Sequence, residues 1–197
     1  MRNREIPTCS RRHGSVRIGI AGLIPALILA IGLGVPAVAA NGDEPVSVRV
    51  AENSADRIVL EYVIGDYTVE PVMIDGGKYA HIKLGKESPL KNVGAPALPT
   101  VNRSIVIPND ARMEVRVLAS SHHDVAGVRI APSKKAEIAE DSRGNAFYPQ
   151  ELVSLDRPYI LRDYRGTVLE VHPFQYNPVA GVLRVYTSLS IEVVKAG

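Results

Sequence analysis

Residues 183–193, within the run Val182–Val194, alternate strictly between apolar and polar side chains. A period of two places successive side chains on opposite faces, so this pattern predicts a β-strand with one buried face. A strand cannot cover its own apolar face, and the rest of the chain must therefore supply strands that pack on it. The apolar face consists of Leu183, Val185, Thr187, Leu189, Ile191 and Val193, and the polar face of Arg184, Tyr186, Ser188, Ser190 and Glu192.

The other strand-like runs are short and separated by turn signals. Asp75-Gly76-Gly77 predicts a tight hairpin turn, Arg165-Gly166 a second turn, and Asn177-Pro178 with Gly181 a third. We therefore predict an all-β fold, an antiparallel β-sandwich of jelly-roll or barrel-like type, over residues 41–197. The expected strands are Val46–Ala51, Arg57–Ile64, Tyr67–Ile74, Lys78–Leu84, Arg103–Pro108, Met113–Ala119, Val125–Ile130, Tyr159–Asp163, Thr167–Pro173 and Val182–Val194.

The first forty residues are typical of a secretory signal peptide. A basic region ends at Arg17, an apolar run follows over Ile18–Val35, and Val38-Ala39-Ala40 supplies the small residues that a signal peptidase requires. We predict cleavage between Ala40 and Asn41. A retained membrane anchor is the alternative, which the glycines and prolines of the apolar run disfavour. The predicted product is exported to an extracellular, periplasmic or cell-surface location, without membrane contact after cleavage.

The formal net charge of +2 arises from this leader. Removing its five arginines and one glutamate from 23 basic and 21 acidic residues leaves 18 and 20, a net charge of −2 for residues 41–197. A slightly acidic domain gives no electrostatic reason to expect nucleic-acid binding. Cys9 is the only cysteine and lies in the leader, so the predicted mature chain has neither disulfides nor a thiol nucleophile.

No pattern predicts catalysis, a cofactor or a metal. His122-His123-Asp124 contains metal-ligating residue types, but neighbouring residues on a strand point to opposite faces, so the two imidazoles would diverge. No G-x-S-x-G elbow or phosphate-binding glycine loop is present. An enzyme in its own right is therefore the least favoured class.

Two segments between the strands stand out. Gly85–Thr100 is rich in proline and glycine and predicts an extended loop that crosses the surface. Ser133–Tyr148 is the most polar region after residue 40 and predicts a long exposed loop. Long loops inside compact domains are often functional.

Four strings in this chain resemble the N-terminal propeptide of gingipain-type secreted cysteine peptidases, and they occur in the same order as in that family. They are Gly94–Pro108 (GAPALPTVNRSIVIP), Val128–Lys134 (VRIAPSK), Leu155–Gly166 (LDRPYILRDYRG) and Pro173–Thr187 (PFQYNPVAGVLRVYT). The resemblance covers much of residues 94–194. It implies a β-sandwich prodomain that helps a caspase-like catalytic domain to fold, covers its active site and keeps it latent.

In the arginine- and lysine-specific members of that family, an exposed prodomain loop presents a basic side chain to the specificity pocket. Here the polar loop after IAPSK occupies the corresponding place, with Lys134, Lys135 and Arg143 as candidates. Arg143 is favoured because Gly144 beside it allows an exposed turn. A substrate-like residue on a rigid scaffold binds at little entropic cost.

The sequence ends at Gly197 without a catalytic domain, so we expect either a fragment of a longer precursor, with its peptidase in cis, or a free-standing protein that acts in trans. The alternative function is a secreted or cell-surface adhesion or carbohydrate-binding module. Such a module would depend on aromatic residues such as Tyr148, Tyr159, Tyr164 or Tyr176.

Overall fold

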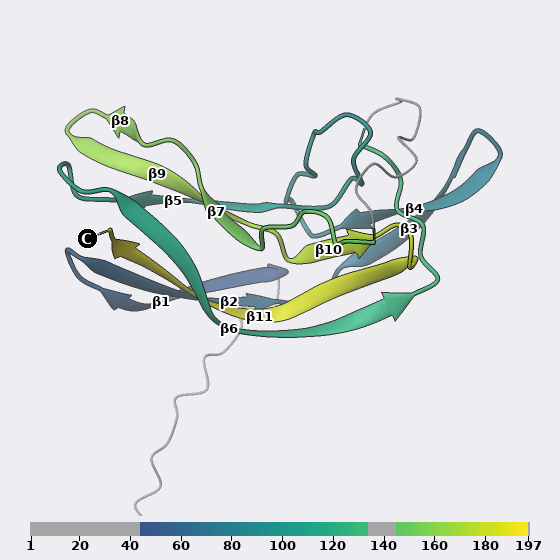
Figure 1. The fold of residues 1–197 in the computed structure, drawn as a ribbon, viewed down its shortest axis with the longest axis horizontal. Coiled ribbons are helices and arrows are strands. Elements are labelled where there is room, and N and C mark those ends of the chain that lie inside the picture. The colour runs from purple at the N-terminus through teal and green to yellow at the C-terminus, as the bar shows by residue number, and fades with distance from the viewer. Residues whose placement is uncertain (1–43, 134–144, 197) are drawn as a thin grey trace, which may run out of the picture. The chain divides into compact units, whose positions relative to one another are not determined.

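The computed structural model describes residues 44–133 and 145–196, in which the regular secondary structure is entirely β-strand. Among these residues no helix is long and apolar enough to cross a membrane. The eleven strands of Figure 1 are β1 (Val46–Asn53), β2 (Arg57–Ile64), β3 (Thr68–Ile74), β4 (Gly77–Lys83), β5 (Val101–Val106), β6 (Met113–Ala126), β7 (Val153–Leu155), β8 (Tyr159–Leu161), β9 (Tyr164–Val171), β10 (Phe174–Asn177) and β11 (Val182–Lys195).

The larger sheet is built around β11, the strand with the strict alternation. One edge of β11 pairs with β10 over its first residues and with β2 over its later ones, and the other edge pairs with β6. β1 completes the sheet by pairing with β2. All of these pairings are antiparallel, as the sequence predicted.

The smaller sheet has β9 at its centre, with β5 on one side and β7 and β8 on the other. β3 and β4 form a separate hairpin, whose predicted turn is confirmed because Asp75 and Gly76 both have positive φ, 48° and 80°. Figure 1 shows the smaller sheet above the larger one, and the chain passes from β9 into β10 at His172-Pro173.

The core lies between the two sheets. Leu60 and Tyr62 of β2 and Ile191 of β11 belong to the same buried cluster as Leu169 and Val171 of β9. Apolar side chains removed from water on both inner faces are what hold the layers together. The prediction of an antiparallel β-sandwich is confirmed.

β6 corrects one prediction. The sequence was expected to form two strands, over residues 113–119 and 125–130, with a break at the two histidines, whereas β6 continues through both of them to Ala126. It follows β11 along its length, and the register shifts at Thr187 of β11 and at Leu118 of β6. The shift also turns Thr187 to solvent and buries Tyr186, so Thr187 is not part of the apolar face as predicted.

The predicted turn at Arg165-Gly166 is wrong by three residues. The chain turns at Arg162-Asp163, where Arg162 has a φ of 55°, and both Arg165 and Gly166 lie within β9. Gly166 is opposite Tyr159, and a Cβ there would come within 2.9 Å of the tyrosine ring. Glycine at this position therefore allows a close approach between a ring and a strand, and does not form a turn.

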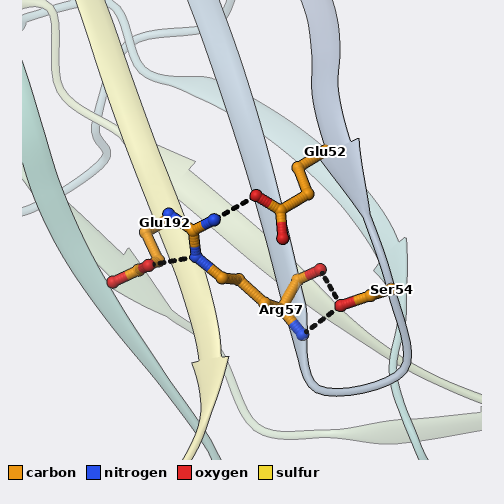
Figure 2. Close-up of polar contacts among 4 residues, drawn as sticks. All are labelled: Glu52, Ser54, Arg57 and Glu192. Carbon is orange, nitrogen blue, oxygen red and sulfur yellow. Dashed lines mark hydrogen bonds and ion pairs between the residues drawn. The ribbon is translucent and has the colours of Figure 1, made fainter.

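Polar contacts join three strands at one end of the larger sheet (Figure 2). Arg57 at the start of β2 forms ion pairs with Glu52 of β1 and Glu192 of β11, the latter with 2.5 Å between Nε and Oε1. The Ser54 hydroxyl accepts a hydrogen bond from the Arg57 amide at 3.1 Å and donates one to the Arg57 carbonyl at 3.0 Å. These two bonds close the β1–β2 turn.

Candidate functional site

The predicted loop candidates Lys134, Lys135 and Arg143 lie outside the described residues, as do Ala40 and Asn41 at the predicted signal cleavage site. The structure does describe the chain on both sides of residues 134–144. We name these two segments, residues 128–133 and 145–150, the loop base. Their contacts show how the fold holds the chain on either side of residues 134–144.

The first segment of the loop base is held by backbone hydrogen bonds on two sides. Ala80 of β4 donates to the carbonyl of Arg129 at 2.7 Å and accepts from the amide of Ala131 at 2.9 Å. On the other side, Ala97 donates to the carbonyl of Ala131 at 2.8 Å, and Ser133 donates to the carbonyl of Ala95 at 2.8 Å. The chain is therefore held by backbone hydrogen bonds up to Ser133, the last described residue before residue 134.

These contacts correct the prediction for residues 85–100. The proline-rich segment was expected to cross the surface, but its second half is buried, with Leu98 only 1% exposed. The backbone groups of Ala95 and Ala97 pair with the loop base instead of with water. Buried backbone groups need such partners, and the loop base supplies them.

The second segment of the loop base is paired with β10. Tyr148 and Tyr176 exchange two backbone hydrogen bonds, of 2.9 and 2.8 Å. The Asn177 side chain donates to Oδ1 of Asn145 at 2.8 Å, and Asn92 donates to the Tyr148 hydroxyl at 2.9 Å. The chain that leaves the loop is thus fixed as firmly as the chain that enters it.

Two residues of β10 join the loop base to the rest of the domain. The Tyr176 hydroxyl donates to the carbonyl of Val128 at 2.9 Å, so this one residue contacts both segments of the loop base, and its burial raises the pKa of the phenol. Gln175 donates to the carbonyl of Pro149 at 2.8 Å and accepts from the hydroxyl of Tyr186 at 2.8 Å. These side chains connect the loop base to β11.

Two arginines pack against aromatic rings beside the loop base. The guanidinium of Arg129 lies 4.6 Å from the centre of the Tyr79 ring, and that of Arg184 lies 4.3 Å from the Phe147 ring. Arg184 also donates two 2.9 Å hydrogen bonds to Asp124, which holds the pKa of that carboxyl below its ordinary value. Both arginines are thus engaged in stacking contacts of the kind that favours arginine over lysine.

The histidines, and the tyrosines named for the alternative function, do not gather at one place. His122 packs 5.2 Å from the Tyr186 ring, and among the described residues no group of histidines, cysteines and carboxylates converges on one point. Tyr176 is buried, whereas Tyr159 and Tyr164 are exposed at the other end of the domain. The four tyrosines named for sugar binding therefore do not form one surface.

The residues that hold residues 128–133 and 145–150 in place were not predicted. All four residues of β10 are buried, and its Phe-Gln-Tyr-Asn alternation is too short to mark a strand. The string QYNP was the one sequence signal for this strand, because a turn signal follows it directly. The fold and this site together define a class, an all-β scaffold that fixes both ends of one polar loop.

The chain belongs to the Propeptide_C25 family, whose model matches residues 38–196. Gingipain R1 of Porphyromonas gingivalis is 38% identical over 116 residues, which are 53% of this chain and 12% of the relative. Lys-gingipain of the same organism is 24% identical over 190 residues, which are 87% of this chain and 11% of the relative. The chain thus spans a small part of the length of these relatives.

Solved structures agree with this family. The complex of Porphyromonas gingivalis RgpB pro- and mature domains has a TM-score of 0.69 and 28% identity, and the match covers 76% of this chain and 85% of that one. A structure on the zymogenic latency of gingipain K from the same organism has a TM-score of 0.65 and 21% identity, covering 80% and 96%, which shows the shared fold. The predicted resemblance to gingipain propeptides is confirmed.

Proposed function

We propose that this chain is a non-catalytic prodomain that assists the folding of a gingipain-type cysteine endopeptidase and keeps it latent by covering its active site. The observation that carries the proposal is the family match over residues 38–196, supported by the likeness to a complex of pro- and mature domains. The partner is a caspase-like peptidase domain, either in the same precursor or in trans.

The loop base supports this function physically. Both ends of residues 134–144 are fixed by hydrogen bonds of 2.7–2.9 Å to buried parts of the sandwich. A loop whose ends are already ordered loses less conformational entropy when it binds, so a larger share of the contact energy remains as affinity. We propose that Arg143, Lys134 or Lys135 enters the specificity pocket of the peptidase.

We also propose that residues 1–40 are a signal peptide, cleaved between Ala40 and Asn41, and that residues 41–197 are the exported domain. The family match begins at residue 38, close to the proposed cleavage site. Export would bring the domain to the extracellular, periplasmic or cell-surface location where a secreted peptidase has to be kept latent.

The test is inhibition of mature gingipain R1 and mature Lys-gingipain by the purified chain. We expect inhibition by the wild type and a loss of at least tenfold in one of two variants, Arg143→Ala or Lys134→Ala/Lys135→Ala, because removing a buried cation leaves the pocket's partner groups unpaired. Lys195→Ala is the matched control, since this exposed lysine lies at the end of β11 and should not matter.

Inhibition that is unchanged in both loop variants would retain the prodomain but reject the three basic residues as the pocket contact. Absence of binding to either peptidase would reject the proposed function itself.

A further inference from the structure

The β8–β9 hairpin carries an exposed apolar surface that the sandwich does not use. Ile160, Leu161 and Tyr164 are 67–68% exposed, and Val106 on the neighbouring β5 is 62% exposed. We name Val106, Tyr159, Ile160, Leu161 and Tyr164 the tip patch. Soluble proteins seldom leave several large apolar side chains together in water unless another molecule covers them.

The strand register places most of the tip patch on one face. Val106 and Tyr159 both lie opposite Gly166, on either side of β9. Leu161 lies opposite Tyr164, which is two residues from Gly166 and therefore on the same face. This is the outer face of the smaller sheet, because the odd-numbered residues of β9, such as Leu169, point into the core.

The charges around the tip patch indicate what kind of partner fits it. Asp156 and Asp163 balance the exposed Arg157 and Arg162, and residues 156–166 contain no lysine and no glutamate. The third arginine of this segment, Arg165, is half-buried and donates to backbone carbonyls of the β5–β6 connection. A membrane surface or a nucleic acid is bound by clusters of basic side chains, which are absent here. Tyrosine and arginine are instead enriched at protein–protein interfaces, and lysine and glutamate are depleted there.

The position of the tip patch makes it a second contact and not an extension of the loop. β9 runs eight residues from Tyr164 to Val171, about 25 Å at the usual rise per residue, before the chain reaches β10 and the loop base. Figure 1 accordingly shows β8 and β10 far apart along the sandwich. A stable protein interface buries about 800 Å² on each partner, far more than one inserted side chain supplies.

We propose that the tip patch is a second docking site for the catalytic domain of the peptidase, separate from the loop that enters the active site. This inference rests on the proposed function. It implies that the prodomain holds the peptidase at two places, so that binding persists when the active site is already occupied.

The experiment measures binding of the full chain to mature gingipain R1 and to mature Lys-gingipain, each both free and with its active-site cysteine blocked by an irreversible peptidyl inhibitor. The test variant is Leu161→Ser/Tyr164→Ser, and the matched control is Val50→Ser/Val63→Ser, which changes two exposed apolar residues of the larger sheet. Circular dichroism and thermal unfolding verify that both variants fold as the wild type does.

We expect the wild type and the control to bind at least one blocked peptidase, and the tip-patch variant to bind it at least tenfold more weakly. Equal binding by all three proteins, with inhibition by the wild type intact, would overturn this inference and leave the proposed function standing. Binding of the wild type to the free peptidases but to neither blocked one would overturn this inference alone. No binding of the wild type to either free peptidase would overturn both the inference and the proposed function. The tip-patch variant could instead keep its peptidase binding and lose either self-association or binding to phospholipid vesicles. That result would assign the patch to a second copy of the chain or to a membrane, and it would overturn the proposal.

Discussion

Two buried tyrosines differ in whether their hydroxyl groups have a partner. Tyr62 is 1% exposed, and its hydroxyl makes no hydrogen bond with any described residue, while burial raises its pKa to about 12. Tyr176 is also buried, but its hydroxyl donates to the carbonyl of Val128. A buried polar group without a partner costs free energy, whereas a satisfied one contributes modestly.

We therefore predict opposite effects of the same substitution. Tyr62→Phe should raise the free energy of unfolding by about 1 kcal/mol, and Tyr176→Phe should lower it by about 1 kcal/mol. Urea unfolding followed by circular dichroism measures both values. Equal destabilisation by the two variants would contradict the prediction, because it would mean that the Tyr62 hydroxyl is hydrogen-bonded in solution.

His172 should make the stability of the domain depend on pH. It is buried where β9 passes into β10, with Nδ1 3.4 Å from the hydroxyl of Thr100, and burial lowers its pKa although the nearby Glu170 and Glu151 act to raise it. The unfolded chain then binds the proton more readily than the folded one, so stability falls as the pH drops through about 6.5, the usual pKa of histidine.

The measurement is the urea midpoint at several pH values between 7.5 and 5. We predict that it falls toward pH 5 in the wild type and falls less in His172→Gln, with His123→Gln, an exposed histidine, as the control. Parallel pH profiles for the wild type and His172→Gln would rule out this histidine as the cause.

At the scale of the strand, an isoleucine contributes differently to stability in β11 and in β8. Ile191 is fully buried in the central strand, and Ile160 is 68% exposed at the hairpin tip. We predict that Ile191→Ala lowers the free energy of unfolding by about 2–5 kcal/mol, since it leaves a cavity, and that Ile160→Ala changes it by less than about 0.5 kcal/mol. Thermal and urea unfolding compare the two, and a comparable loss in both would show that the hairpin tip packs against the domain.

Most of the longer strands were predictable from the sequence, and two short ones, β7 and β10, were not. β2 has the predicted bounds, and β11 is one residue longer than predicted. β7 has three residues and β10 has four, which is too few for a period to mark a strand. The continuous β6 was missed because its register shifts interrupt the alternation in the sequence.

At the scale of the whole molecule, the sequence did not predict the contacts that hold the loop base. IAPSK lies mostly within the loop base and QYNP mostly within β10, yet their role depends on hydrogen bonds between segments about fifty residues apart, such as Tyr176 to Val128. The tip patch was likewise not predicted, because an apolar run such as Tyr159-Ile160-Leu161 usually lies in a core. Its exposed fractions show that nothing within the described residues covers it.

The central position of β11 determines when this domain can fold. β11 joins β2, β6 and β10, and its residues 182–195 are synthesised after every other strand of this domain. Until they emerge, β1 and β2 form only an isolated hairpin, which is marginally stable in water. We therefore expect the earlier strands of the larger sheet to stay largely unfolded until β11 has been synthesised, a state in which an export channel that threads extended polypeptides could still accept the chain.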